Sequence, residues 1–323
     1  MKVVVRILTC AAGAALICTT VGAQTYPNKP VRMIVAFAPG GGTDVIARVV
    51  ANKLTQAWGQ TVVVENKAGA GSMIGTRFVA TSPADGYTIL VTSTSFVVNP
   101  TLYKQPGYDA VKDFAPIING GYSPTLVFTT PSIPAKTLPE LMALGKAKKM
   151  SYATAGIGTI SHLTAENVFN TVAKADISHA PFSGAGPAFQ AVVGGHVPVG
   201  ALAFATPGLL DWVKGGKLNP IAISSDKRIS ALPDVPTFTE AGYPGHVEYT
   251  WIGFFAPAGT PKEIVAKSNE AIAKVMQEKE VRDLLTNIGF DWAPNTVDQF
   301  SVYVKEELVK WGGVVKATGI KVD

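Results

Sequence analysis

The chain has 323 residues, with 28 Lys and Arg against 23 Asp and Glu, and a formal net charge of +5 at neutral pH. This length allows two domains with large cores. The slight basic surplus, with no block of Lys or Arg, argues against a nucleic-acid-binding protein, and we expect no nucleic-acid partner.

The first 23 residues have the pattern of a cleavable secretory signal. Lys2 and Arg6 precede an apolar run, which ends in the small residues Val21-Gly22-Ala23. The run is too short for a membrane span. Both cysteines, Cys10 and Cys18, lie in this segment, so a mature chain would have no disulfide or thiol chemistry. We therefore expect export to the periplasm and cleavage after Ala23.

The segment Phe37-Ala38-Pro39-Gly40-Gly41-Gly42-Thr43-Asp44 lies between a predicted strand, 31–36, and a predicted helix, 45–58. Its glycines let backbone N–H groups approach a ligand closely, and Thr43 and Asp44 suit the start of a helix. Helix N-termini favour anions. The stretch is therefore a candidate anion-binding loop, although an ordinary strand-to-helix turn explains it equally well.

After a strand over 61–65, a second glycine-rich turn, Gly69 to Gly75, opens a helix to about residue 81. It resembles a dinucleotide fingerprint, but no acidic residue follows at the distance that a ribose requires, so an ordinary turn is favoured. The next strand, 88–92, ends at Ser93-Thr94-Ser95. Ligands bind outside the carboxyl ends of such strands, so Ser93 and Ser95 are candidate site residues, with a plain loop as the alternative.

The pattern restarts near Thr125. A strand over 151–154 leads into Gly156-Ile157-Gly158-Thr159 and then a helix that carries His162. This repeats the order of strand, glycine turn and hydroxyl-capped helix found at residues 37–44. Two such loops, far apart in sequence, could face each other across a cleft.

The remaining predicted elements continue the alternation of strands and helices. They are strands over 115–118, 125–129, 177–182, 197–204, 221–225 and 249–256, and helices over 138–148, 187–193, from Pro207, 261–279, 281–287 and 296–318. This alternation predicts an α/β fold with mostly parallel sheets covered by helices on both faces.

Residues suited to catalysis are sparse. No two of the four histidines form a close metal-binding pair, and neither a G-x-S-x-G nucleophile turn nor a phosphate-binding G-x-x-x-x-G-K-[ST] loop occurs. His162 is the histidine expected near the site, although a capping or packing role is favoured for it. The pattern favours binding over turnover, and we expect no catalytic residue, cofactor or metal.

Several segments together resemble the Bug family, the periplasmic solute-binding proteins of tripartite tricarboxylate transporters. The resemblance covers nearly the whole chain after residue 23. It is carried by Tyr26-Pro27, Lys29-Pro30-Val31-Arg32, 37–41 with 43–44, 64–66, 69–71, 74–75, 85–88, 113–114, 116–117, 156–166, 194–195, 234–237 and 255–261.

The resemblance implies a two-lobed periplasmic-binding-protein fold (type II-like) that closes over a small carboxylate, a di- or tricarboxylate or a related organic acid. Main-chain and hydroxyl groups of two loops, one per lobe, would hold one carboxylate group of this ligand. The resemblance further implies membrane permease subunits as partners, and we expect a monomer. The lobes are expected at 24–123 with 244–323, and at 124–243. The expected ligand-binding residues are Phe37, Ala38, Gly41, Thr43 and Asp44; Ala155, Gly156, Thr159 and His162; and Ser93, Ser95, Ser183, Gly184, Phe204, Ala205 and Thr206.

Two departures from the family pattern concern ligand choice. Where relatives often have an aspartate shortly after Pro187-Ala188, and a polar or acidic residue near Ala205, this chain has neither. We expect weaker recognition of an ammonium group. The alternatives are a secreted α/β enzyme, either an oxidoreductase that uses Gly69 to Gly75 or a hydrolase, and a receptor that senses its ligand.

Overall fold

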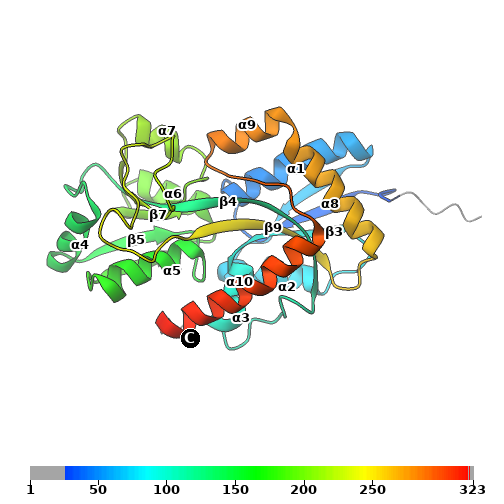
Figure 1. The fold of residues 1–323 in the computed structure, drawn as a ribbon, viewed down its shortest axis with the longest axis horizontal. Helices are drawn as coiled ribbons and strands as arrows, with labels where there is room; N and C mark the ends of the chain where they lie inside the picture. Colours follow the sequence, from blue (N-terminus) through cyan, green and yellow to red (C-terminus); the bar gives the residue numbers. More distant parts are fainter. Residues whose placement is uncertain (1–25, 319, 321–323) are drawn as a thin grey trace, which may run out of the picture.

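The computed structural model describes residues 26–318 and 320, so the predicted signal sequence lies outside the described residues. Nine strands form a curved sheet flanked by helices (Figure 1). The strands are β1 (Val31–Val35), β2 (Val62–Asn66), β3 (Thr88–Ser93), β4 (Phe114–Thr129), β5 (Met150–Thr154), β6 (Ile177–Pro181), β7 (Val199–Ala203), β8 (Asn219–Ile223) and β9 (Tyr249–Pro257). The helices are α1 (Gly42–Trp58), α2 (Met73–Ala80), α3 (Ser95–Leu102), α4 (Leu138–Ala147), α5 (Ile160–Glu166), α6 (Ala185–Val193), α7 (Leu209–Lys214), α8 (Lys262–Gln277), α9 (Lys279–Asn287) and α10 (Val297–Thr318).

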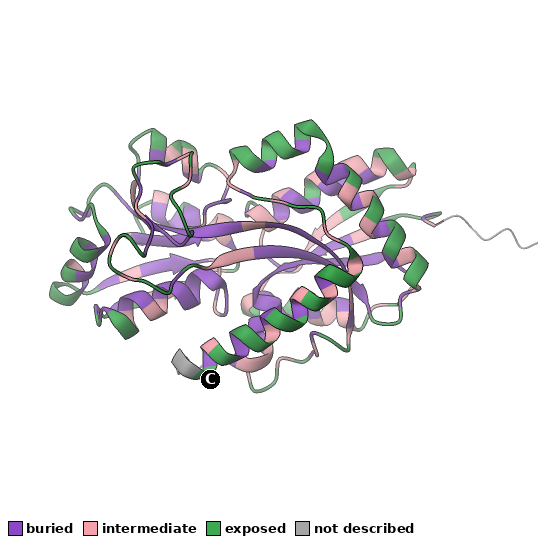
Figure 2. Cartoon of the chain, in the orientation of Figure 1, coloured by how far each residue is buried: buried purple, intermediate pink, exposed green. Residues whose placement is uncertain are grey.

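The strand directions confirm the predicted α/β class with mostly parallel sheets. In one half, β1 is parallel to β2 and β3, and β9 is antiparallel to β3. In the other half, β5 is parallel to β6 and β7, whereas β4 is antiparallel to β7 and β8. Each half therefore has one reversed strand. Most strand residues are buried, except in the edge strands β2 and β6, and the outer faces of the helices are exposed (Figure 2).

The long strand β4 connects the two halves. Residues 114–124 of β4 pair with β9, and residues 125–129 pair with β7 and β8. The sequence analysis predicted two separate strands here, over 115–118 and 125–129. The structure instead has register shifts between Pro116 and Ile118 and between Asn119 and Gly121, where Gly121 has φ +133°. Such bulges bend a strand without ending it. The lobe boundaries at 123/124 and 243/244 stay a prediction.

Three helix assignments differ from expectation. Helix α1 is capped by Gly41, with no side-chain cap, so Thr43 lies in its first turn and is not the cap. Helix α7 begins after Gly208, whose φ is +81°, and not at Pro207. Helix α3 was not predicted: its residues 95–99 are all buried, which removes the polar face that identifies an amphipathic helix.

The three C-terminal helices lie against the first half of the molecule (Figure 1). Helix α10 packs against α3 and β4, and α8 packs against α1. The buried Glu307 of α10 accepts hydrogen bonds from the indole N–H groups of Trp251 (3.0 Å) and Trp311 (2.8 Å). Because Trp251 lies on β9, this carboxylate ties α10 to a strand that connects the halves. No described helix is long and apolar enough to cross a membrane.

Candidate functional site

The first predicted loop is held in place by Asp44. One carboxylate oxygen of this buried residue accepts from the Gly40 N–H (3.1 Å) and from Arg48 (2.9 Å), and the other accepts from Asn66 (2.8 Å). Burial raises the pKa of Asp44, but the hydrogen bonds from Arg48, Asn66 and Gly40 outweigh it, and the pKa lies below its ordinary value. The carboxylate is thus ionised and fully engaged with the protein, so its evident role is to shape the loop.

The second predicted loop lies between β5 and α5. Thr159 caps α5: its hydroxyl accepts from the His162 N–H (3.3 Å) and donates to the Gly156 carbonyl (2.8 Å). His162 Nδ1 accepts from the Gly158 N–H (3.3 Å). These three hydrogen bonds hold the loop in place. Gly156 and Gly158 have φ of +140° and +79°, which side chains other than glycine rarely adopt.

A second histidine lies directly behind this loop. The rings of His162 and His179 stack with their centres 4.1 Å apart, and His179 Nε2 is 2.7 Å from the hydroxyl of Thr154. Burial lowers the pKa of His162 to about 4, partly opposed by Glu166. Burial and the neighbouring His162 lower the pKa of His179 to about 3. Both rings are therefore neutral near pH 7, and the His162 ring packs against His179.

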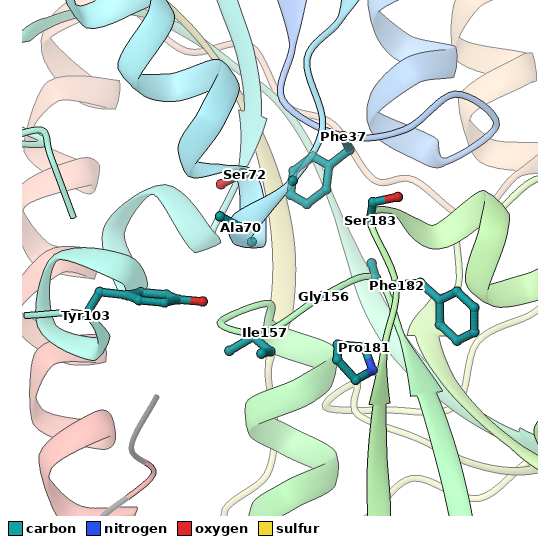
Figure 3. Close-up of a pocket in the computed structure, with 12 residues that line it drawn as sticks. Phe37, Ala70, Ser72, Tyr103, Gly156, Ile157, Pro181, Phe182 and Ser183 are labelled. Atoms are coloured by element: carbon teal, nitrogen blue, oxygen red, sulfur yellow. The ribbon is translucent and has the colours of Figure 1, made fainter. Parts of the chain in front are cut away.

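Between the two loops lies a cavity of about 190 Å³ (Figure 3). Its walls come from both halves of the molecule. The lining residues are Phe37, Gly69, Ala70, Gly71, Ser72, Tyr103, Ala155, Gly156, Ile157, Pro181, Phe182 and Ser183. Four of the residues predicted to bind ligand are among them: Phe37, Ala155, Gly156 and Ser183.

The halves touch on both sides of this cavity. The Ala38 N–H donates to the Ser183 carbonyl (2.9 Å). A Cβ added to Gly186 would lie 2.6 Å from the carbonyl oxygen of Pro39. A Cβ added to Gly71 would overlap the carbonyl oxygen of Ile157. Glycine is therefore required where the loops of the two halves meet.

Four of the lining residues have backbone donors without a partner. The amide N–H groups of Phe37, Ala155, Ile157 and Ser183 make no hydrogen bond within the part of the chain that the structure describes. They come from three loops and from both halves. Unpaired N–H groups that line a cavity are suited to an anionic oxygen, because a buried donor without a partner is unfavourable.

The other predicted residues lie behind the lining or away from it. Ser93 and Ser95 are buried, and Ser95 shares hydrogen bonds with Ser93 (3.2 Å) and with Ser72 (2.8 Å), so these hydroxyls support the Gly69–Ser72 turn. Those that do not line the cavity are Ala38, Gly41, Thr43, Asp44, Ser93, Ser95, Thr159, His162, Gly184, Phe204, Ala205 and Thr206.

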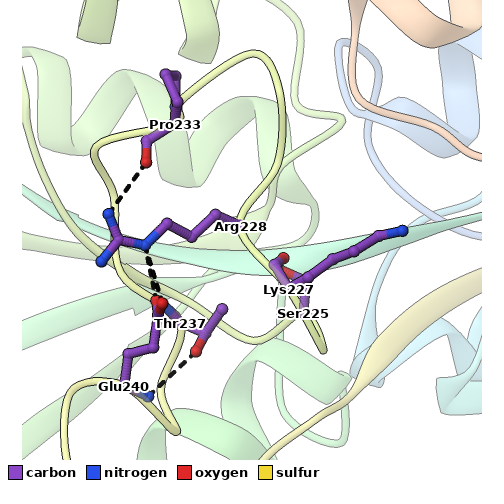
Figure 4. Close-up of polar contacts among 6 residues, drawn as sticks. All are labelled: Ser225, Lys227, Arg228, Pro233, Thr237 and Glu240. Carbon is purple, nitrogen blue, oxygen red and sulfur yellow. Dashed lines mark hydrogen bonds and ion pairs between the residues drawn. The ribbon is translucent and has the colours of Figure 1, made fainter.

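Phe204 lines a second cavity, of about 390 Å³, near the strands that connect the halves. Two cations line it. Arg228 is already engaged, because it donates to both oxygens of Glu240 (3.1 and 2.9 Å) and to the Pro233 carbonyl (3.1 Å), while Lys227 extends away from this group (Figure 4). Asp226 also faces this space, which disfavours an anion there. We therefore take the first cavity as the candidate site.

The sequence analysis missed Tyr103 and the turn Gly69–Ser72 as parts of the site. The turn has a run of positive φ values, +126° at Gly69, +48° at Ala70, +59° at Gly71 and +83° at Ser72. Its glycines were the available signal, but they were compared only with a dinucleotide motif. Tyr103 follows the helix that was not predicted. No cluster of three or more His, Cys, Asp or Glu side chains that could hold a metal occurs among the described residues.

Residues 46–320 match the model of the tripartite tricarboxylate transporter family receptor. The chain is 37% identical to protein BugT of Bordetella pertussis over 322 residues, which is 98% of this chain and 97% of that protein. It superposes on the periplasmic binding protein BugD with a TM-score of 0.86 at 33% identity, covering 92% of this chain and 99% of BugD. MatC from Rhodopseudomonas palustris, solved with bound malate, gives a TM-score of 0.83 at 32% identity, covering 90% and 100%.

Proposed function

Because the chain belongs to the tripartite tricarboxylate transporter receptor family, we propose that it binds a small organic carboxylate in the periplasm and delivers it to membrane permease subunits. The observation that carries this proposal is the group of unpaired N–H donors from both halves around one cavity. Such donors can hold a carboxylate without a buried cation, which avoids the large penalty of desolvating an ion pair.

The solved relative with bound malate supports a carboxylate as the ligand class. Lobes that close on a ligand by hinge motion are an established mode of receptor action, and β4 and β9 are the strands where such a hinge would lie. The family consists of receptors, so the alternative of a secreted enzyme finds no support there.

Three finer points belong to the proposal. The segment before Gln24 would be a cleavable signal that directs the chain to the periplasm. The mature receptor would act as a monomer. Each copy would present both of its halves to the permease subunits and so deliver the solute to them. N-terminal sequencing of the exported protein, together with its mass in solution, tests the first two points, and loss of solute uptake on deletion of the receptor tests the third.

A thermal-shift screen of the mature protein tests the proposed ligand class. The probes are mono-, di- and tricarboxylates, with the matched carboxamides and NAD and NADP as controls. A carboxylate at 100 times its dissociation constant should stabilise the protein by about 2.7 kcal/mol, whereas its neutral amide should give no shift. Stabilisation by a dinucleotide and by no carboxylate would overturn the proposal.

A further inference from the structure

Asn99 of α3 lies behind the cavity, at a place where the two halves of the molecule meet. Its side chain is completely buried. The side-chain NH2 group donates to the carbonyl of Gly71 (2.7 Å), which belongs to the same half as Asn99. Only the NH2 group can donate to a carbonyl, so this hydrogen bond fixes which of the two terminal atoms of the amide is Oδ1.

The oxygen of this amide has no partner. Asn99 Oδ1 accepts no hydrogen bond from any described residue, and it is too enclosed for a water molecule to reach it. Gly158, from the loop of the other half, covers it: a Cβ added to Gly158 would lie 2.4 Å from Oδ1. A Cα–H bond of Gly158 therefore points at the oxygen, and such a contact is weaker than a hydrogen bond from water.

The two ends of the Asn99 amide thus differ in what happens to them when the halves separate. The hydrogen bond to Gly71 lies within one half, so it is present in the open and in the closed protein. The contact with Gly158 joins the halves, so it exists only in the closed protein, and opening lets water reach Oδ1. Closure therefore removes water from an acceptor and supplies no full hydrogen bond in return, which is unfavourable.

We propose that Asn99 is a positioning residue that opposes closure of the two halves, so that closure depends on the ligand. This inference rests on the proposed function, because it requires that the halves separate to admit the ligand. An unfavourable term present only in the closed protein lowers the affinity of every ligand by the same factor. Asn99 therefore sets how tightly the receptor binds, and it does not choose which carboxylate is bound.

Calorimetry and urea denaturation of Asn99→Ala test the inference together. The variant loses the hydrogen bond to Gly71 in both states, so it should be less stable than the wild type. It also removes the unpaired oxygen from the closed state, so the carboxylate that binds best should bind about 3- to 10-fold more tightly. A side chain that only supports the fold would instead lower stability and affinity together.

Asn99→Asp changes the same oxygen in the opposite direction. Aspartate has nearly the shape of asparagine, but closure would then place a carboxylate against Gly158. Burying an unpaired charge is more unfavourable than burying an amide oxygen. The same ligand should therefore bind about 10-fold or more weakly to Asn99→Asp than to the wild type.

The matched control is Asn269→Ala. The Asn269 amide donates to the carbonyls of Ile117 (2.7 Å) and Asn295 (3.2 Å), and all three residues lie in the same half as Asn99. Its loss should lower stability and leave the affinity within about 2-fold of the wild type.

Two outcomes would overturn the inference. One is wild-type or weaker binding by folded Asn99→Ala. The other is wild-type or tighter binding by Asn99→Asp, which decides the matter alone if Asn99→Ala does not fold. Failure of every carboxylate to bind the wild-type protein would instead refute the proposed function.

Discussion

Gly71→Ala should weaken ligand binding in addition to destabilising the protein. Gly71 has φ +59° and ψ +38°, a left-handed conformation that costs an alanine about 1–2 kcal/mol. Its added Cβ would also overlap the carbonyl oxygen of Ile157. Ile157 belongs to the other half of the molecule and contacts Gly71 directly, at the edge of the cavity. The halves could not approach as closely as they do here. Relieving such an overlap by a backbone shift costs about 1–3 kcal/mol, or about 5- to 150-fold in the dissociation constant.

Gly59→Ala is the matched control for this experiment. Gly59 has φ +63°, and a Cβ added there meets nothing within 4 Å. Urea denaturation should show a similar loss of stability in both variants, whereas calorimetry with the best carboxylate should show weaker binding only for Gly71→Ala. Wild-type affinity in Gly71→Ala would refute the view that the Gly71–Ile157 contact belongs to the ligand-bound state.

Three further predictions concern residues behind the site. Because His162 and His179 have folded-state pKa values of about 4 and about 3, the unfolded chain takes up protons first below its pKa of about 6.5. The free energy of unfolding should therefore fall from pH 7 to pH 4, by up to about 1.4 kcal/mol per pH unit for each ring, and an unchanged urea midpoint would contradict this. Glu307→Ala leaves two buried indole N–H groups unpaired and should cost about 2–4 kcal/mol; the exposed neighbour Glu306→Ala should cost under about 0.5 kcal/mol by the same denaturation measurement. Asp44→Asn should weaken carboxylate binding about 10-fold in calorimetry, because it loses charged hydrogen bonds that shape the first loop; unchanged affinity would show that the loop does not need them.

The sequence predicted the fold well where an element had two distinct faces or a clear glycine turn. It failed at α3, whose residues 95–99 are buried on every side, so that no amphipathic pattern marks the helix. It also divided β4 in two, because Gly120-Gly121 gives the same signal whether a strand bends or ends.

The candidate site was predictable only in part, for a similar reason. Glycine and hydroxyl residues identified the loops of Phe37 and Gly156, because their local order of strand, turn and helix is visible in the sequence. Whether a turn faces the cavity depends on the opposite half: the lining role of Gly71 arises from its contact with Ile157. The engagement of Asp44 with Asn66 likewise requires the fold, because β2 brings that amide to the loop.

The most direct test of the central claim is a crystal structure of the mature protein with the carboxylate that binds best. The account predicts that this carboxylate lies in the cavity between the halves, with its oxygens about 2.7–3.2 Å from amide nitrogens among Phe37, Ala155, Ile157 and Ser183. A carboxylate located instead in the second cavity beside Phe204, or held by Lys227, would contradict it.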